Sequence, residues 1–483
     1  MSAPTASTGT KSHTGLALLV IMIGVLMVAI DTTIVVLALP VMQRSLHVAL
    51  SAVIWVVIGY LLTITLVSTQ VGRLGDIFGR VKMYETGFLV FILGSALCAL
   101  SNSETTIIGF RIIQGLGGAL VMANSGAVIA DTFPPNRLGR AYGFNSVGYT
   151  VGAIFGILLG GVIVTYFSWR WIFWVNVPIG IVAYVMALKV LRDSGKRQRQ
   201  RLDLAGMLTL GLGLFGILWG ITKLSTDPFT MEIVLYLIGG VILMIAFVFV
   251  ERVREAPMVH MSIFRIPAMT PTLTAAFLQG LANYAVLFLV IMYLQGVREY
   301  SPLKASLLLV PGYIVGSFVG PFSGKLADRV GAVIPATLGL GIQVVALLIY
   351  AQLGTVTGVW LVIVASTISG IGASAFFPAN NSAVMKAAPS EMFGIASGML
   401  RTFSNVGMVF SFAVAILVAA RSIPRNLAFA IFVGTTKLTT HLASVFTAGL
   451  HSAFYASTIF MALAAILSAT RVLSKSTSRS RIR

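Results

Sequence analysis

Long apolar stretches, separated by short polar segments, run along almost the whole chain. Each stretch is close to the roughly 20 residues that an α-helix needs to cross the hydrocarbon core of a bilayer. The first stretch is longer than the apolar part of a signal peptide, and another stretch follows it, so we expect it to be retained. The pattern predicts fourteen spans, at residues 15–39, 49–71, 82–100, 105–130, 138–165, 171–191, 204–223, 231–250, 268–296, 303–323, 333–353, 357–385, 392–420 and 448–470.

The composition agrees with this pattern. Hydrophobic residues make up 57% of the chain and charged residues 10%, whereas a soluble domain has about 25% charged residues. The fold class is therefore all-α, a polytopic membrane protein. The single cysteine, Cys98, excludes an internal disulfide, and the five histidines show no metal-ligand spacing. We expect no metal and no cofactor.

The positions of the basic residues matter more than the formal net charge of +19. If the N-terminus is cytoplasmic and the spans alternate, most of the 33 basic residues fall on the cytoplasmic side, as the positive-inside rule requires. This predicts a multi-pass plasma-membrane protein with both termini in the cytoplasm. The basic run at 196–201 is expected to contact anionic lipid headgroups. A nucleic-acid partner is disfavoured, and we expect a monomer.

A short phrase occurs twice. Residues 72–80 read GRLGDIFGR and residues 324–332 read GKLADRVGA, an offset of 252 residues. Each phrase ends one apolar stretch and begins the next. A duplicated loop of this kind indicates a transporter whose two similar halves rock against each other.

The repeat and the polar segments together predict the domain organisation. Two six-helix halves are joined by a basic linker and two inserted helices. The predicted boundaries are a disordered tail at 1–14, a first half at 15–191, a linker at 192–203, inserted helices at 204–250, a second half at 268–470 with an outer loop at 421–447, and a basic cytoplasmic tail at 471–483.

The repeated loop carries a candidate charge cluster. Gly72 and Gly79 allow tight packing and positive φ, and Asp76 is placed near the start of the next helix, where the helix dipole favours a carboxylate. Arg80 and Asp131 belong to the same cytoplasmic face. We interpret these residues as a conformational latch, with Asp328 as the counterpart of Asp76 in the second half. The alternative is that they only cap helices and orient the loop.

Two charged residues lie deep in spans of the first half. Asp31 is nine residues before Pro40, about 13 Å from that end of the span, and Arg111 lies at a similar depth in the fourth span. A charge at such depth costs at least about 2.5 kcal/mol, so it usually faces a wet cavity or a partner. We interpret Asp31 as a proton carrier that pairs with Arg111. The alternative is a fixed, purely structural ion pair.

Other polar side chains inside spans are candidates for a substrate cavity. A deep arginine in the second half, Arg401, suits either an anionic group or backbone carbonyls of a broken helix. Glycines at 148, 152, 156 and 160 give the fifth span a smooth face, which we place at the interface between the halves. The cavity candidates are Gln114, Asn145, Tyr149, Gln279, Asn283, Tyr284, Asn380, Asn381 and Arg401.

These motifs resemble those of the major facilitator superfamily, and within it the fourteen-helix drug:proton antiporters. The segments that carry the resemblance are GRLGDIFGRVK at 72–82, DTTIVVLALP at 31–40, RIIQGLGG at 111–118 and WRWIFWVNVPIG at 169–180. The resemblance implies the major facilitator fold and links Arg111 to proton coupling. The chain departs from the antiporter signature at Ile157, where the signature has a proline.

The expected function is proton-coupled efflux of a small amphipathic organic compound by alternating access. No GxxxxGK[ST] loop is present, so ATP is not the expected energy source. A second possibility is a proton-coupled transporter of an anionic metabolite or lipid. A membrane receptor is a more remote alternative, and an enzyme is disfavoured because the spans hold no deep cluster of His, Cys or paired carboxylates.

Overall fold

The computed structural model describes residues 9–48, 50–133, 138–193, 195, 197, 201–388, 393–421 and 440–480. In this part of the chain, fourteen helices are long and apolar enough to cross a membrane, which confirms the predicted fold class. Three elements are short: α2 (Leu50–Val53), α7 (Trp171–Trp174) and η2 (Met261–Arg265). The long helices are α1 (Gly9–Leu46), α3 (Trp55–Phe78), α4 (Arg80–Leu100), α5 (Glu104–Thr132), α6 (Leu138–Tyr166), α8 (Asn176–Val190), α9 (Leu204–Thr226), α10 (Met231–Val253), α11 (Met269–Met292) with its π-helical extension η3 (Tyr293–Val297), α12 (Pro302–Val330), α13 (Val333–Tyr350), α14 (Trp360–Ala387), α15 (Phe393–Arg421) and α17 (Thr440–Ser480).

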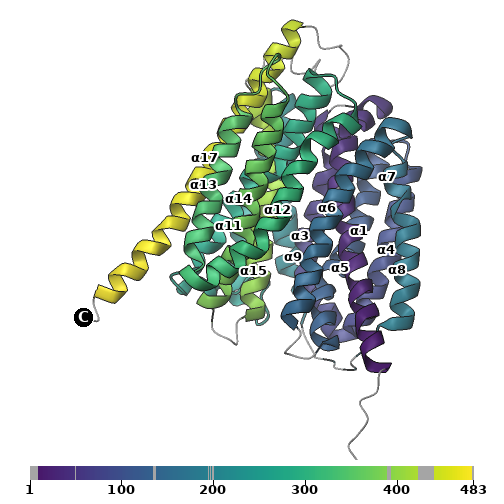
Figure 1. The fold of residues 1–483 in the computed structure, drawn as a ribbon, viewed down its shortest axis with the longest axis vertical. Helices are drawn as coiled ribbons and strands as arrows, with labels where there is room; N and C mark the ends of the chain where they lie inside the picture. The colour runs from purple at the N-terminus through teal and green to yellow at the C-terminus, as the bar shows by residue number, and fades with distance from the viewer. Residues whose placement is uncertain are drawn as a thin grey trace, which may run out of the picture.

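The helices form two bundles side by side (Figure 1). The first half contains α1, α3, α4, α5, α6 and α8, and the second contains α11 to α15 and α17. The beginning of α1 and the end of α17 lie on the same side of the molecule in Figure 1, as an even number of spans requires. We call the side where α1 begins the proximal side and the side where α1 ends the distal side.

The inserted helices form a hairpin. α9 packs against α3 of the first half and α15 of the second half, and α10 packs against α9. Trp55 at the start of α3 packs against two aromatic side chains of α9, with ring centroids 5.6 Å from Phe215 and 5.1 Å from Trp219. Apart from the surface that packs against α9, most of α10 is exposed, as suits a helix that faces lipid.

Several helix ends differ from the sequence-based prediction. The predicted disordered tail at 1–14 is helical from Gly9, where α1 begins, and α3 and α12 each continue about two turns beyond their predicted ends, to Phe78 and Val330. α1 continues past Pro40 to Leu46, because a proline inside a helix removes one backbone hydrogen bond without forcing the helix to stop. α17 begins at Thr440, so the end of the predicted outer loop at 421–447 is helical, and residues 422–439 lie outside the described residues. α17 also continues into the predicted cytoplasmic tail.

The glycine face of α6 packs within the first half, and its predicted place between the halves is wrong. A Cβ atom on Gly152 would lie 2.6 Å from the carbonyl oxygen of Leu26, and one on Gly156 2.7 Å from that of Ile30, both on α1. The spacing shows that a close neighbour exists but does not say which helix it is. The exception is Gly161, where a Cβ atom would lie 3.0 Å from the Cα atom of Leu303 on α12.

The substitution Gly156→Ala should therefore destabilise the first half. Its Cβ atom would overlap the backbone of α1, and overpacking of this kind costs about 1–3 kcal/mol. Thermal unfolding of the purified protein in detergent measures the effect. Gly143→Ala on the same helix is the control, because nothing lies within 4 Å of its Cβ position. Equal stability of the two variants would contradict the close α1–α6 contact.

Candidate functional site

Asp31 on α1 and Arg111 on α5 form a buried ion pair in the distal half of the first bundle. Nη1 of Arg111 donates a hydrogen bond to Oδ2 of Asp31 over 2.6 Å. The exposed fraction is 0% for Asp31 and 1% for Arg111. The two charged side chains, whose similar depth in their spans predicted a pair, are thus in direct contact.

Gln114 lies one helical turn from Arg111 and closes a ring with the pair. Its Oε1 accepts a hydrogen bond from Nη1 of Arg111 at 2.7 Å, and its Nε2 donates to Oδ1 of Asp31 at 2.8 Å. A Cβ atom on Gly94 of α4 would lie 2.5 Å from the backbone nitrogen of Gln114. The glycine therefore lets α4 and α5 approach closely at the level of this ring.

Ser95 on α4 and Asn176 on α8 complete the network. Nδ2 of Asn176 donates to Oδ1 of Asp31 at 3.1 Å and to Oγ of Ser95 at 3.2 Å. Ser95 also accepts from Gln114 at 3.1 Å and donates to the carbonyl oxygen of Phe173 at 2.9 Å. The Asp31 carboxylate thus accepts three hydrogen bonds.

Arg111 has partners besides Asp31. Nε donates to the carbonyl oxygen of Val56 at 2.9 Å, and the guanidinium carbon lies 3.9 Å from the ring centroid of Tyr60. A cation over an aromatic face gains about 2 kcal/mol when it is desolvated. Arg111 would keep these contacts if the charge on Asp31 were neutralised.

The repeated loop of the first half carries a second charge cluster, on the proximal side. Arg80 pairs with Asp76 at 2.9 Å and with Asp131 at 3.0 Å. Asp76 lies in the last turn of α3 and not at the start of the next helix, because Gly79 is the only residue between α3 and α4. Arg80, in the first turn of α4, supplies the compensating charge.

The glycines of the two repeated loops have different roles. Gly79 has φ +112° and Gly331 has φ +92°, a conformation that glycine adopts without strain. Gly72 is helical and has nothing within 4 Å of its Cβ position, so the prediction of tight packing does not hold there. Asp328 lies on α12, and its side chain is outside the described part of the structure.

The linker after α8 lies against the same loop. A Cβ atom on Gly79 would lie 2.3 Å from Oδ2 of Asp193 and 2.6 Å from Nη2 of Arg197. Arg197 and Asp193 form an ion pair of 2.7 Å, and the hydrogen bonds from Arg197 hold the pKa of the Asp193 carboxyl below its ordinary value. The loop and the linker are therefore one assembly.

Three of the predicted cavity residues are buried in polar contacts. Gln114 belongs to the ion-pair network. Gln279 on α11 is fully buried and donates to Oε1 of Gln343 on α13 at 3.1 Å. Asn380 on α14 accepts a hydrogen bond from Arg471 on α17 at 3.2 Å. The side chains of Gln279 and Asn380 hold helices of the second half together.

The other predicted residues are more accessible. Tyr149 on α6 and Tyr284 on α11 are close neighbours across the two halves. Arg401 on α15 is exposed and close enough to Tyr142 of α6 for an electrostatic interaction. In the described part of the chain, Arg401 has no ion-pair partner. The remaining candidates are Asn145 and Asn283, which are half-buried, and Asn381, which is exposed.

Two hydrogen bonds join the halves on the distal side. The backbone nitrogen of Leu303 donates to Oγ1 of Thr165 at 3.0 Å, and Nε2 of Gln295 donates to the carbonyl oxygen of Leu37 at 3.2 Å. At the proximal end of α6, by contrast, Tyr142 and its neighbours are exposed. The halves are therefore joined distally by hydrogen bonds, whereas side chains at the proximal end of α6 are exposed.

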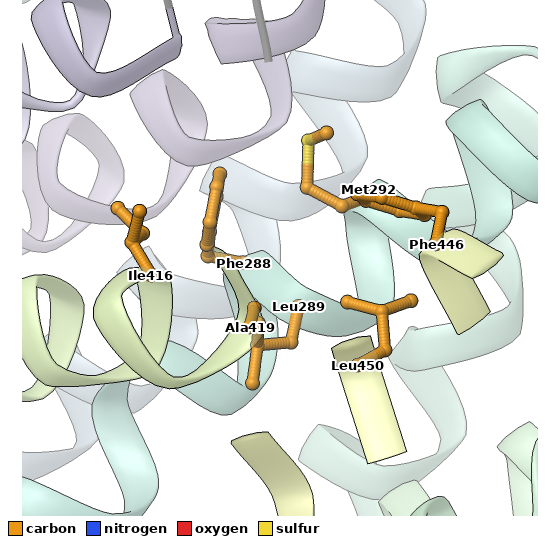
Figure 2. A pocket seen from close by; sticks show the side chains of 7 residues that line it. All are labelled: Phe288, Leu289, Met292, Ile416, Ala419, Phe446 and Leu450. Atoms are coloured by element: carbon orange, nitrogen blue, oxygen red, sulfur yellow. The ribbon is translucent and has the colours of Figure 1, made fainter. Parts of the chain in front are cut away.

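A small pocket lies in the distal part of the second half, between α11, α15 and α17 (Figure 2). It offers no polar side chain to a proton or a charged substrate, and none of the predicted site residues lines it. The lining residues are Phe288, Leu289, Met292, Ile416, Ala419, Phe446 and Leu450.

Sequence reasoning missed Ser95 and Asn176, because a single small polar residue in an apolar span gives no signal of its partner. Ser95 sits in an ordinary apolar run. Asn176 lies in the segment WRWIFWVNVPIG, whose resemblance to a family signature was the only available hint.

Two repeated six-helix bundles with a buried polar network in the first define a class of polytopic membrane transporters. A family profile described as Major Facilitator Superfamily matches residues 21–412. The chain belongs to this superfamily of transporters, and the predicted fold is confirmed.

Curated relatives are similar over most of the chain. The "Tetracenomycin C resistance and export protein" of Streptomyces glaucescens is 30% identical over 87% of this chain and 78% of its own length. The "Riboflavin transporter RibZ" of Clostridioides difficile (strain 630) is 29% identical over 86% and 90%. A bacterial homologue of the human lysosomal transporter Spinster, crystallised in an inward-facing and unoccupied conformation, shares the fold with a TM-score of 0.67, 17% identity and coverage of 96% and 97%.

The ion pair makes a testable contribution to stability. Arg111→Gln alone should destabilise the protein by about 3–5 kcal/mol, because it leaves a buried carboxylate unpaired. Adding Asp31→Asn should recover part of this loss, because two neutral amides can hydrogen-bond in the same place. Thermal unfolding of the wild type, the two single variants and the double variant gives the coupling energy.

The control is Asp227→Asn, which removes an exposed ion pair with Lys223 at 3.4 Å. It should change the stability by less than about 1 kcal/mol. Additive effects of Arg111→Gln and Asp31→Asn would contradict a coupled buried pair.

Proposed function

We propose that this protein is a proton-coupled antiporter that exports small amphipathic organic compounds. The observation that carries the proposal is the ion pair of Asp31 and Arg111, fully buried inside the first half of a major facilitator transporter. A buried carboxylate that can take up a proton is the group that such coupling needs.

Protonation of Asp31 would remove one charge of the pair and leave Arg111 as a buried cation. Arg111 keeps its hydrogen bond to Val56 and its place over Tyr60, so the cation does not need to move far. The network amides of Gln114 and Asn176 would lose a charged acceptor. The balance between two packings of the halves would then depend on one proton, which is the condition for coupling.

The direction of exchange follows from which side of the membrane gives protons access to Asp31 and gives the substrate access to the transporter in each conformation. Asp31 is sealed from solvent in the present conformation, so proton exchange requires the halves to move. In the exporter, substrate enters the exposed proximal interface, where Tyr142 and Arg401 lie. A proton reaches Asp31 from the distal side in the alternative conformation, and return to the present one carries the proton inward.

The substrate class is proposed from the relatives and from the accessible side chains. The relative from Streptomyces glaucescens is named for resistance and export of tetracenomycin C. Aromatic side chains near the interface, among them Tyr149 and Tyr284, offer flat amphipathic surfaces to an organic molecule. We place the protein in the plasma membrane with its proximal side in the cytoplasm, where the basic linker and tail meet anionic headgroups.

A second candidate is a proton-coupled transporter of an organic anion. Arg111 is neutralised by Asp31, which leaves Arg401 as an accessible cation without an ion-pair partner among the described residues. An arginine fork suits carboxylate or phosphate groups. The name of the relative from Clostridioides difficile, a riboflavin transporter, shows that transport within this group of relatives extends beyond drugs.

A transport assay in inside-out vesicles distinguishes these functions. With an imposed gradient, acidic inside, the wild type should accumulate a fluorescent lipophilic cation. Asp31→Asn should slow accumulation more than about tenfold, equivalent to about 1.4 kcal/mol on the barrier. Glu104→Gln is the control, because Glu104 lies in the first turn of α5, outside the network, and it should retain transport.

Transport by Asp31→Asn at the wild-type rate would overturn the role of Asp31. If the wild type accumulates no cation, a fluorescent organic anion is the next probe, with Arg401→Gln as its test variant.

The latch has a separate test. Asp76→Asn removes one partner of Arg80 but leaves Asp131 in place, so the protein should fold. Transport should slow by about two- to fivefold, because a partly exposed ion pair contributes up to about 1 kcal/mol. The rate is measured in the same vesicles. Asp227→Asn, which breaks a distal ion pair, should leave it unchanged. An unaltered rate for Asp76→Asn would reduce the cluster to a helix-capping role.

A further inference from the structure

A second group of buried acids lies outside the ion-pair network. Asp203 immediately precedes α9, and Glu251 lies in the last turn of α10. Their exposed fractions are 3% and 2%. Both are on the proximal side, where the two ends of the inserted hairpin meet, and neither takes part in the proposed coupling through Asp31.

One oxygen atom of each carboxyl group has a donor. Oδ1 of Asp203 accepts a hydrogen bond from the backbone nitrogen of Gly206 at 2.8 Å, which caps α9. Oε2 of Glu251 accepts from the backbone nitrogen of Val259 at 2.6 Å. The other two oxygens, Oδ2 of Asp203 and Oε1 of Glu251, accept no hydrogen bond in the described part of the structure.

The two unsatisfied oxygens lie near the same point. A Cβ atom on Gly206 would lie 2.5 Å from Oδ2 of Asp203 and 2.4 Å from Oε1 of Glu251, and the two carboxyl groups interact directly. Two ionised carboxylates at such a place repel each other. A single proton turns one oxygen into a donor and leaves the other as its acceptor, so it satisfies both.

The neighbouring cations do not replace this proton. Nε of Arg254 lies 3.7 Å from Oδ1 of Asp203, and its side chain is 53% exposed. Arg73 of α3 is close to both acids, but its guanidinium donates to backbone carbonyl oxygens of Arg201, Ala256 and Pro257 at 3.0, 2.8 and 2.7 Å.

The remaining groups nearby do not compensate the charge of the two acids either. Burial, and then the charge of Arg73, lower the pKa of His260, so this histidine is largely neutral at neutral pH and adds no compensating charge. Arg201 pairs with Glu255 at the surface, where both side chains are nearly four-fifths exposed. Among the described residues, Gln70 of α3 forms its hydrogen bonds with the backbone of Asp203, at 3.1 Å and 3.4 Å.

We propose that Asp203 and Glu251 share one proton, and that this proton fixes the two ends of the α9–α10 hairpin to each other and to α3. Gln70 and Arg73 make the connection to α3. Because α9 also packs against α15 of the second half, the pair is a second protonation site at a helix that contacts both halves. It is independent of the proposed role of Asp31.

Infrared spectroscopy of the purified full-length protein tests the shared proton directly. At about pH 7, where an ordinary carboxyl group is ionised, the wild type should show a protonated carboxylic-acid band that Glu251→Gln lacks. The control Glu255→Gln changes an exposed acid of the same segment and should keep the band. An unchanged band in Glu251→Gln would overturn the proposal. Asp31→Asn identifies any contribution from Asp31.

The pH dependence of stability provides a second measurement. The folded pair holds a proton that an unfolded carboxyl group loses above about pH 4. Stability should therefore fall as the pH rises from there, by up to about tenfold in the unfolding equilibrium constant per pH unit, until the shared proton leaves. Wild type and Glu255→Gln should show this slope in thermal unfolding.

Glu251→Gln should fold and lose the slope, because its amide can donate to Oδ2 of Asp203 and accept from Val259 without a titrating proton. Equal slopes in Glu251→Gln and wild type would overturn the proposal. So would stabilisation of the wild type by sodium over choline at constant ionic strength, because that would identify a bound cation between the carboxylates.

Discussion

The architecture of the first half depends on one constraint: a charge inside a membrane bundle must be paired and hydrogen-bonded. Asp31 and Arg111 meet this condition completely, since both are buried and in direct contact. Four helices, α1, α4, α5 and α8, contribute a side chain to the network around them. A change in the charge of Asp31 therefore reaches four of the six helices of this half without passing through solvent. That is what makes the pair suitable for coupling as well as for stability.

Close helix contacts make this network possible. Short side chains such as Ser95 can reach a partner on another helix only where backbones approach closely, and the glycines supply that approach. Gly94 brings α4 to the level of Gln114, and Gly156 brings α6 against α1 beside Thr33. The first half thus forms one packed unit, and hydrogen bonds join it to the second half on the distal side. This is the division of rigidity that rocking of two halves requires.

The sequence predicted the spans, the repeat and the depth of Asp31 and Arg111, because hydrophobicity and cost of burial are properties of single residues. It could not predict which helix faces the glycines of α6, because spacing identifies a smooth face but not its neighbour. Gln114 shows the same limit. Its polarity suggested a cavity, but its place beside a buried carboxylate follows from the packing of α5 against α1. The coupling and latch roles of these residues stay predictions.

The two copies of the repeated loop are not equivalent in their surroundings. In the first half, Arg73 donates to backbone carbonyls of two linker segments, and Gly79 lies against Asp193 and Arg197. In the second half, Lys325 is exposed, and no described atom lies within 4 Å of a Cβ position on Gly331. The inserted hairpin and its linkers therefore hold the first loop and leave the second free of them. Because α9 also packs against α15, the hairpin contacts both halves, and the buried acids at its proximal end lie beside the held first loop.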